Sequence, residues 1–375
     1  SPRRPIRVLV LSPIPEEGAG CRFRVSHYVP YLEAHGFEVT IRSFYTRDFF
    51  RLVYRPGHFL QKSTTFLKLL RERWKVLDDL DRYDLVWLYR EAVPIGPPLI
   101  ERRIVQRGIP IVYDFDDAIF LLSESGENLP STSEANKAFA FLKNPSKVAE
   151  IVAASRHVAA GNSFLADYAR RFNPAVTVLP TVVDTDRFVP DPGRHQVAAS
   201  GLVVGWIGSP TTFHYLERLA PLLKEVASRH QFTLKVSGAG KAAHFDGVTV
   251  NEVPWALDRE VELFNTCDIG VYPLDDDDWA RGKCGFKAIQ FMACGVPVVA
   301  AAVGVNREII RDGEDGFLAS TPAEWTDKLG RLLTDPALRA RFSAAGRQRI
   351  EERYSLRATA PQLARILNDA VAVHP

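Results

Sequence analysis

Cationic and amide side chains recur at helical spacing within the segment Arg281–Gly295. Lys283, Lys287 and Gln290 stand at positions i, i+4 and i+7, so a helix would place them on one face. A glycine-containing turn, Cys284–Phe286, would open this helix, and backbone N–H groups at a helix start bind anions. The combination predicts a site for a diphosphate and the ribose of a nucleotide. A solvated surface helix with two lysines is the alternative reading of this segment alone.

Carboxylates gather in two further places. Asp114, Asp116 and Asp117 follow an apolar run that ends at Tyr113, and Asp275–Asp278 form the second group. A carboxylate at the end of a buried strand can accept a hydrogen bond from a substrate hydroxyl. Asp114 or Asp117 could instead cap the next helix. A magnesium site is a further alternative for either group, since such sites combine one or two carboxylates with substrate phosphates.

The composition narrows the classes of function. The chain has 375 residues, 46% of them hydrophobic, and a net charge of +2, which is an ordinary soluble profile that does not favour a nucleic-acid binder. The charge is unevenly spread, because residues 1–75 carry 14 Lys and Arg against 6 Asp and Glu. The basic residues in 42–76 are interleaved with aromatic ones. This stretch suits an anionic membrane surface or an anionic acceptor.

The cysteines and the hydropathy pattern indicate a cytoplasmic protein. Cys21, Cys267, Cys284 and Cys294 show no CxxC spacing, and the histidines form no HxH or HExxH pattern, so neither a zinc site nor a redox pair is expected. No apolar run approaches the length of a transmembrane helix. The run Val8–Leu11 is too short for a signal peptide. We expect a reduced cytoplasmic location, peripheral on the inner face of the membrane.

Strand-like and helix-like segments alternate along the chain. In the first half, strands are predicted at 6–11, 37–43, 85–88, 109–113, 158–160 and 176–180. In the second half, they are predicted at 202–208, 232–237, 248–251, 269–272 and 296–300. Helices are predicted at Phe23–Ala34, Tyr215–Arg229, 286–293, 337–353 and 357–373. This alternation is typical of the α/β class with doubly wound parallel sheets.

The predicted organisation is two Rossmann-like domains joined by a linker. Residues 1–190 form the N-terminal domain, residues 191–200 have the composition of a linker, and residues 201–355 form the C-terminal domain. Residues 356–375 form a last helix. Open parallel sheets bind ligands at the carboxyl ends of their strands. Two such sheets facing a central cleft suit a two-substrate transfer reaction, and equally a hinged binding protein.

Several segments resemble retaining glycosyltransferases of family 4, which have the GT-B fold. Met292–Val299 reads Met-Ala-Cys-Gly-Val-Pro-Val-Val and is similar to the second half of that family's donor-binding signature. Further segments follow in the family's order and spacing: Asn162–Ala166, Val178–Phe188, Gly205–Pro210, Asp268–Leu274, Asn306–Ile310 and Asp312–Leu318. The resemblance spans residues 160–355. It implies a GT-B fold with acceptor and donor domains, and a last helix that crosses back to the first domain.

The chain departs from that signature at its acidic positions. Aligned on Gly295, the family's two acids fall on Gly282 and Gln290. The Gln290 amide can still hydrogen-bond a ribose hydroxyl, because it both donates and accepts. An acid near the sugar would have to come from Asp275–Asp278.

The family's diphosphate-binding cations are also absent from their usual place. They follow the first strand of the second domain, where this chain has Ser209–Thr212. We expect Lys283, Lys287 and Arg281 to replace them. The family's Glu in the loop after a later strand corresponds to Glu308, a predicted nucleotide contact.

The resemblance also assigns residues in the first domain. A histidine that lies close to the sugar in many family members falls on Asp116, which is expected to hydrogen-bond a sugar hydroxyl or orient the acceptor. Gly18 and Gly20 lie in a loop similar to the family's glycine-rich loop, where the backbone approaches a ligand closely. Arg22 and Arg24 follow this loop and are candidates for the diphosphate, with a solvated helix start as the alternative.

The predicted site is therefore the following. The catalytic residues are Asp116, Lys283 and Lys287. The donor-binding residues are Gly18, Gly20, Ser209, Arg281, Cys284, Gly285, Phe286, Gln290 and Glu308. The candidates for acceptor or diphosphate contact are Arg22, Arg24 and Arg90.

The resemblance implies transfer of a sugar from a nucleotide-diphosphate sugar to an acceptor hydroxyl, with retention, without metal or other cofactor. The acceptor would be a saccharide, a lipid-linked molecule or a small molecule, in surface polysaccharide or glycolipid synthesis. Two alternatives stay open: a sugar-nucleotide epimerase or hydrolase on the same fold, and a non-catalytic subunit that binds a nucleotide sugar.

Overall fold

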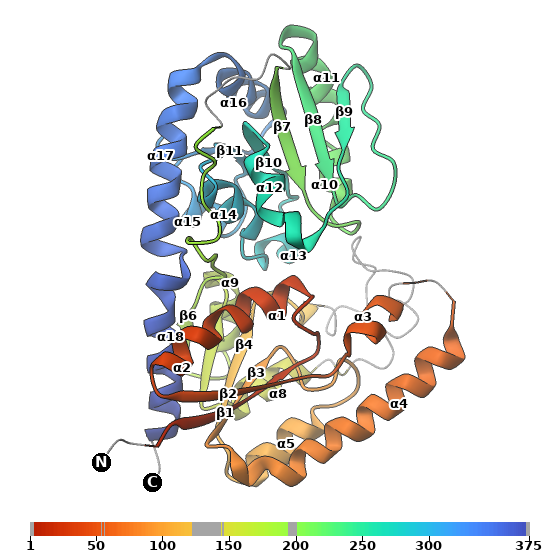
Figure 1. Ribbon diagram of the computed structural model, residues 1–375, viewed down its shortest axis with the longest axis vertical. Coiled ribbons are helices and arrows are strands. Elements are labelled where there is room, and N and C mark those ends of the chain that lie inside the picture. Colours follow the sequence, from red (N-terminus) through yellow and green to blue (C-terminus); the bar gives the residue numbers. More distant parts are fainter. Residues whose placement is uncertain are drawn as a thin grey trace. The chain divides into compact units, whose positions relative to one another are not determined.

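The computed structural model describes residues 4–53, 55, 57–121, 144, 146–193 and 201–372, and these divide into two compact units (Figure 1). The first unit contains the chain up to Thr181 and again from Thr359 onward, whereas the second contains Val182–Ala358. The chain thus enters the second unit ahead of the predicted linker. Residues 194–200 of that linker lie outside the described residues.

The first unit is built on a six-stranded parallel sheet with the order β2-β1-β3-β4-β5-β6. Its strands are β1 (Ile6–Ser12), β2 (Phe37–Ser43), β3 (Leu85–Tyr89), β4 (Ile111–Phe115), β5 (His157–Ala160) and β6 (Val176–Val178). Its helices are α1 (Ala19–Arg24), η1 (Ser26–Tyr28), α2 (Val29–Ala34), α3 (Arg47–Val53), α4 (Phe59–Lys75), η2 (Val76–Arg82), α5 (Leu99–Gln106), α8 (Lys147–Ala154), α9 (Ser163–Arg170) and most of α18 (Leu356–Ala372).

The second unit repeats this architecture with the strand order β12-β11-β10-β7-β8-β9, again all parallel. Its strands are β7 (Leu202–Ile207), β8 (Phe232–Ser237), β9 (Thr249–Glu252), β10 (Ile269–Tyr272), β11 (Val298–Ala301) and β12 (Phe317–Ala319). Its helices are α10 (Phe213–Glu217), α11 (Ala220–Arg229), η4 (Leu257–Arg259), α12 (Glu260–Asn265), α13 (Asp278–Arg281), α14 (Phe286–Ala293), α15 (Asn306–Ile309), α16 (Pro322–Thr334) and α17 (Pro336–Arg353).

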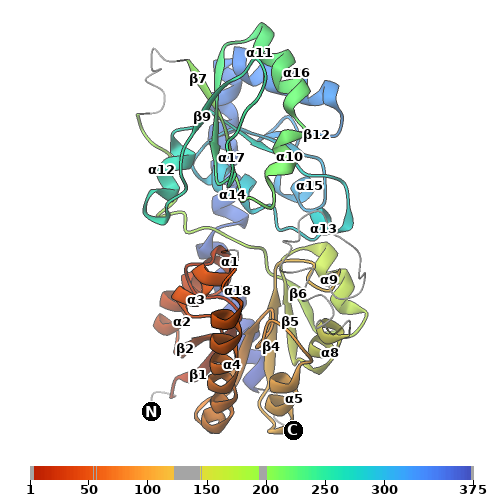
Figure 2. The same ribbon diagram turned by 90° about the vertical axis from the view of Figure 1, so that its right-hand side faces the viewer.

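Both sheets are covered by helices on their two faces (Figure 2). Their central strands are accordingly apolar runs rather than alternating ones: every residue of β3, β4 and β11 is buried. The predicted α/β class, with two doubly wound parallel sheets, is confirmed.

Two predicted helices are wrong in their extent. The segment Phe23–Ala34 is divided into α1, η1 and α2, and the segment Tyr215–Arg229 is divided into α10 and α11. A proline lies in the first turn of the later helix in each case, Pro30 in α2 and Pro221 in α11. Proline has no N–H to donate and is tolerated at a helix start, so each proline marks a new helix rather than the interior of a longer one.

The last helix, α18, packs in the first unit. The Tyr28 hydroxyl lies 2.9 Å from the Thr359 hydroxyl, both of them buried, and the Gln362 side chain donates to the Val178 carbonyl at 3.5 Å. Over the described ranges, no helix is both long enough and apolar enough to cross a membrane.

Candidate functional site

The strand order of the second unit indicates the carboxyl ends of β7 and β10 as the place where an open parallel sheet binds ligands. These two strands are neighbours, but the chain leaves β7 toward β8, on the opposite side from β10. At such a switch in direction the loops diverge and leave room for a ligand. The loop after β10 leads through α13 into α14, so the predicted donor segment lies at this edge.

Two glycines fix α14 against the sheet. Gly205 of β7 and Gly270 of β10 are register partners. A Cβ atom on Gly270 would lie 2.6 Å from Cγ of Phe291, and one on Gly205 would lie 2.2 Å from Sγ of Cys267. The buried Phe291 ring of α14 therefore rests directly on the backbone of the strand, at a depth that no larger residue at 270 permits.

We expect Gly270→Ala to destabilise the second unit by about 1–3 kcal/mol, because the added methyl group overpacks the Phe291 ring. Displacing α14 should also weaken nucleotide binding. Thermal unfolding and calorimetric titration measure both effects. Gly330→Ala in α16 is the matched control, because its nearest neighbour, His230 Nε2, would lie at an ordinary 3.4 Å. Equal effects of the two substitutions would contradict this account of α14.

The first turn of α14 lacks the capping side chain and the acidic residues that commonly stabilise a helix start. Its N-cap is Gly285, with φ at 64° and no side-chain capping bond, and its first turn contains no acidic residue. A Cβ atom at 285 would lie 2.3 Å from Cδ1 of Ile309, so α15 packs closely here. Lys287 instead brings a cation to the positive end of the helix, which opposes the helix dipole and costs about 0.3–1 kcal/mol. A bound anion would reverse that cost.

A hydrogen-bonded network holds the Lys287 side chain. Its Nζ donates to Oε1 of Gln290 at 2.9 Å, and Nε2 of Gln290 donates to Oε1 of Glu260 at 3.2 Å. Arg187 in turn pairs with Oε2 of Glu260 at 3.3 Å. Gln290 and Glu260 are both buried, so neither amide nor carboxylate is left to solvent.

This network alters the interpretation of Gln290. The structure brings Lys287 and Gln290 together, as their spacing indicates, but Gln290 is fully buried and contacts Lys287 and Glu260. The position of Gln290 is suited to orienting the Lys287 side chain. Contact between Gln290 and a ribose stays a prediction. Sequence reasoning missed Glu260 and Arg187, because both lie far from α14 along the chain.

The aspartates before α14 have partners within the second unit. Oδ1 of Asp277 caps α13 by accepting from the Ala280 N–H at 2.7 Å. Arg281 forms ion pairs with Asp276 and Asp278, each at 3.0 Å. Asp275 pairs with Arg218 at 2.6 Å. Two of these aspartates thus pair with Arg281, one caps α13 and one pairs with Arg218.

Other predicted donor-binding residues lie in the second unit, before and at the start of α14 and in the segments that follow β7 and β11. Lys283 Nζ lies 5.2 Å from the centroid of the Trp279 ring, and Cys284 is buried while Phe286 is partly exposed. Ser209 lies in the turn that follows β7, where its N–H donates to the Thr212 hydroxyl at 3.0 Å. Glu308 lies exposed on the short helix α15, after β11.

The first unit brings a second group of predicted residues together at the carboxyl ends of β3 and β4. Arg90 Nε donates to Oδ1 of Asp116 at 2.8 Å, and its Nη2 donates to Asp117 at 2.7 Å. The Tyr89 hydroxyl donates to Asp116 at 2.9 Å. A Cβ atom on Gly20 would lie 2.2 Å from this hydroxyl, so the tyrosine itself requires glycine there. Nothing in the sequence indicated a role for Tyr89 beyond its position at the end of a strand.

The backbone conformation of Arg90 is unusual, and the charges around Asp116 favour its ionised carboxylate. Arg90 has φ at 59°, an uncommon conformation for a residue with a side chain, and such outliers gather at functional sites. Burial raises the pKa of Asp116, but the charges of Arg90 and Arg24, with the hydrogen bonds from Arg90 and Tyr89, together outweigh burial, and the net pKa is lowered. Burial raises the pKa of Tyr89 well above its usual value. At neutral pH Asp116 is therefore ionised and accepts hydrogen bonds from Arg90 and Tyr89.

The two arginines of α1 are both buried. Arg24 pairs with Asp114 of β4, with Nη2 and Oδ1 2.8 Å apart and both side chains 0% exposed, and its Nη1 donates to the Leu179 carbonyl at 2.6 Å. Arg22 donates to the Glu17 carbonyl at 3.4 Å. Arg24 thus joins α1 to β4 within the core of the first unit. A role at the diphosphate stays a prediction for both.

Metal-ligating side chains do not cluster in the part of the chain that the structure describes: no group of three or more His, Cys, Asp or Glu is arranged to hold an ion there. The four cysteines are buried.

Residues 201–335 match the family model described as glycosyl transferases group 1. A curated relative, the D-inositol 3-phosphate glycosyltransferase of Stackebrandtia nassauensis, is 29% identical over 252 residues, which are 60% of this chain and 55% of that protein. Its counterpart from Salinispora arenicola is 30% identical over 53% of this chain and 50% of that protein. The chain spans about half the length of these two relatives.

Solved structures resemble the whole chain. Sucrose-phosphate synthase from Thermosynechococcus elongatus aligns with a TM-score of 0.68 at 17% identity, covering 99% of this chain and 100% of that one. HepE of Anabaena, in complex with UDP and glucose, aligns with a TM-score of 0.66 at 18% identity, covering 97% and 100%. Residues 201–335 are therefore a glycosyl transferases group 1 domain, in a chain that has the GT-B fold.

Proposed function

We propose that the protein transfers a sugar from a nucleoside-diphosphate sugar to an acceptor hydroxyl. The observation that carries this proposal is the first turn of α14, which contains Lys287 and no acidic residue and has the positive end of the helix dipole. This turn lies inside the matched group 1 domain. HepE, which shares the fold, is known in complex with UDP-glucose, and a uridine diphosphate sugar is the first donor to test.

The chemistry follows from the charges on the residues. The bond between the anomeric carbon and the diphosphate breaks, and the electron pair leaves with the diphosphate. Lys287, Lys283 and the α14 dipole stabilise that developing negative charge. The acceptor oxygen bonds the anomeric carbon, and its proton passes to a phosphate oxygen of the leaving group. We propose retention of configuration. The ionised Asp116 provides an acceptor for a sugar hydroxyl.

We further propose that transfer needs no metal, since these cations supply the charge that a divalent ion would otherwise supply. The rate of nucleoside-diphosphate release should be unchanged by excess EDTA and by added Mg²⁺. Calorimetric titration with UDP in EDTA checks binding separately. A rate that EDTA abolishes and Mg²⁺ restores would contradict this.

We propose a saccharide or lipid-linked acceptor at the cytoplasmic face of a membrane, in surface polysaccharide or glycolipid synthesis. The support is the basic and aromatic segment 42–76, which carries nine Lys and Arg against two Asp and Glu.

A panel of nucleotide sugars tests the central proposal. Thermal shift identifies the donor that stabilises the chain, and release of nucleoside diphosphate from that donor measures turnover with each acceptor. Acceptor-dependent turnover is expected. Turnover that no acceptor accelerates would instead indicate a hydrolase or epimerase, and stabilisation without turnover would indicate a non-catalytic binder.

A further inference from the structure

The outward face of α4 combines an apolar stripe with a row of cations. Leu60, Leu67 and Trp74 follow one another at intervals of seven residues, close to two helical turns, and are 85%, 64% and 37% exposed. Arg71 and Lys75 lie one helical turn apart beside this stripe and are exposed as well. An ordinary surface helix buries its large apolar residues, so this stripe calls for a partner.

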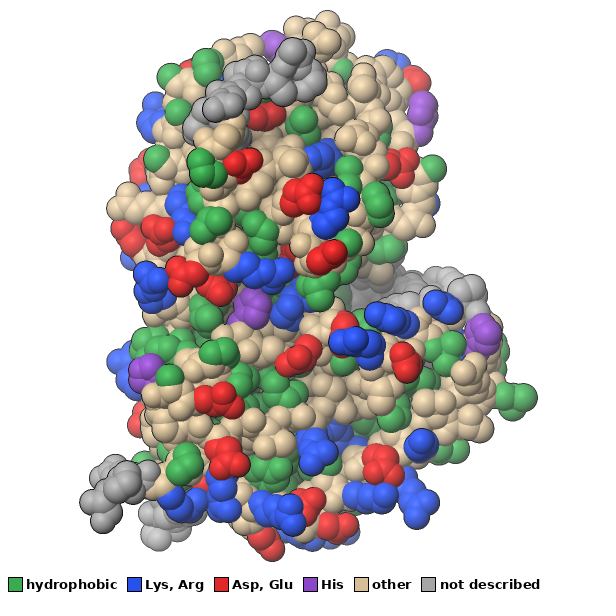
Figure 3. Space-filling model, in the orientation of Figure 1, with side chains coloured by type: hydrophobic (Ala, Val, Ile, Leu, Met, Phe, Trp, Pro, Cys, Tyr) green, Lys and Arg blue, Asp and Glu red, His purple; other side chains and the backbone are tan. Residues whose placement is uncertain are grey.

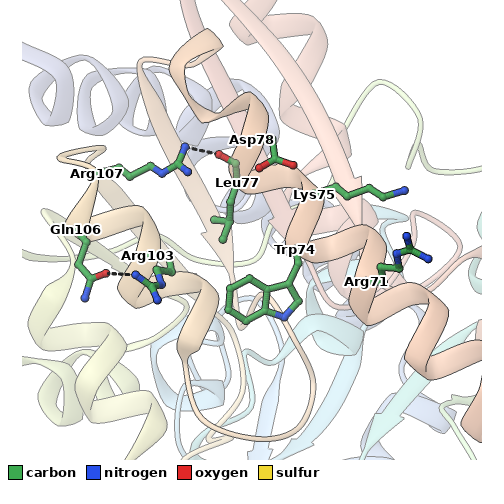
Figure 4. Close-up of a pocket in the computed structure, with 8 residues that line it drawn as sticks. All are labelled: Arg71, Trp74, Lys75, Leu77, Asp78, Arg103, Gln106 and Arg107. Carbon is green, nitrogen blue, oxygen red and sulfur yellow. Dashed lines mark hydrogen bonds between the residues drawn. The ribbon is translucent and has the colours of Figure 1, made fainter.

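A groove adjoins the carboxyl-terminal half of α4. It encloses about 700 Å³ and is lined by Arg71, Trp74, Lys75, Leu77, Asp78, Arg103, Gln106 and Arg107. Figure 4 shows the Trp74 ring projecting between α4 and α5, with Arg103 on one side and Arg71 on the other. Figure 3 shows Lys and Arg side chains along the edge of this unit that α4 forms in Figure 1.

The groove carries an excess of positive charge that its neighbours do not neutralise. Four cations and one acid, Asp78, line it. Lys75 pairs with the exposed Glu72 at 2.7 Å. Arg103 donates to the Gln106 amide at 3.2 Å, and Arg107 donates to the Leu77 carbonyl at 2.6 Å, so neutral groups hold both. Among the described residues no carboxylate pairs with either arginine or with Arg71.

The groove is separate from the candidate site of this unit. Helix α4 continues through η2 into the beginning of β3, and α5 leads into the beginning of β4. The groove therefore lies toward the amino ends of these strands, whereas Arg90 and Asp116 follow their carboxyl ends. A ligand here would not compete with the cluster around Asp116.

We propose that this groove binds the phosphate headgroup of an anionic phospholipid, while Leu60, Leu67 and Trp74 enter the interface of the bilayer. The cations match the charge of the phosphate, and an exposed apolar stripe beside them is the pattern of a helix that lies on a membrane surface. A free phosphate would explain the cations but would leave the stripe without a partner. The inference rests on the proposed membrane-facing role of 42–76 and names its ligand and its residues.

Vesicle binding of the full chain tests the proposal. Flotation compares vesicles of phosphatidylcholine alone with vesicles that also contain phosphatidylglycerol, at low and high salt. Binding should require phosphatidylglycerol and fall with salt. Each cation removed should weaken partition about five-fold, so the double variant Arg71→Gln with Arg103→Gln should lose about 25-fold. Leu67→Gln should weaken binding at both salt concentrations.

The matched control is Arg341→Gln with Arg353→Gln, which removes two exposed cations from α17 and should leave flotation near the level of the unchanged chain. Affinity for UDP, measured by calorimetry, separates this proposal from the glycosyl-transfer proposal, since all these variants should keep it. Equal flotation of the two double variants would overturn the headgroup site. So would equal binding to both kinds of vesicle, or binding of inorganic phosphate without binding to vesicles.

Discussion

Lys287→Ala is expected to weaken binding of a nucleoside diphosphate by about 10- to 150-fold, the equivalent of 1.5–3 kcal/mol for a hydrogen bond between charged groups. The reason is local. Lys287 is held by the Gln290 amide at 2.9 Å, so its ammonium is already oriented before a ligand arrives, and alanine removes both the charge and the donor. Calorimetric titration measures the change in affinity.

The hydrogen-bonded network that holds Lys287 allows a second test of this prediction. Glu260→Gln keeps the volume but removes the carboxylate that fixes the Gln290 amide, so it should weaken binding less than Lys287→Ala does. Lys287→Arg should retain part of the affinity, because the charge stays. Lys224→Ala, at an exposed position on α11, is the control for a lost surface cation. An affinity that Lys287→Ala leaves unchanged would remove this residue from the site.

Asp114→Ala is expected to destabilise the first unit by about 3–5 kcal/mol, because it leaves the Arg24 guanidinium buried without its partner. Both side chains are 0% exposed and lie 2.8 Å apart. The double variant Arg24→Met with Asp114→Leu should recover much of this loss. Hydrogen exchange of the β3 and β4 peptides reports the first unit specifically, which a single melting curve of two units does not. A loss no larger than that of an exposed pair, such as Arg170 with Asp167, would contradict the buried ion pair.

The same pair gives a pH dependence of known sign. Burial raises the pKa of Asp114 to about 6 despite the Arg24 guanidinium. In the unfolded chain the pKa of an aspartate is about 3.9, so between these values the folded state binds more protons than the unfolded state. The part of the stability that comes from protonation of Asp114 is therefore present in full below about pH 4 and is lost as the pH rises through about 6, whereas the packing and hydrogen bonds of the pair remain. Asp114→Asn should remove this slope.

Parallel strands that are buried on both faces consist of short apolar runs, and β3 and β11 are of this kind. Such strands could therefore be predicted from the sequence. The helix boundaries were harder to predict from the sequence. Pro30 and Pro221 each begin a new helix, whereas the apolar periodicity runs on across the break.

Contacts between candidate residues could be predicted only where the residues are close in sequence. The i, i+3 spacing of Lys287 and Gln290 places them in contact, and helical geometry alone dictates this. The buried Gln290 amide donates to Glu260, which the fold brings to it from α12. The Tyr89 hydroxyl against Gly20 and Asp116, and the left-handed backbone of Arg90, likewise depend on the neighbouring strand β4 and on helix α1. No local pattern encodes such partners.

A crystal structure of the chain with a bound nucleoside diphosphate tests the central claim most directly. We expect the diphosphate at the start of α14, with its oxygens within hydrogen-bond distance of Lys287 Nζ and of the backbone N–H groups of the first turn. A diphosphate bound elsewhere in the second unit, with Lys287 still held only by protein groups, would contradict it.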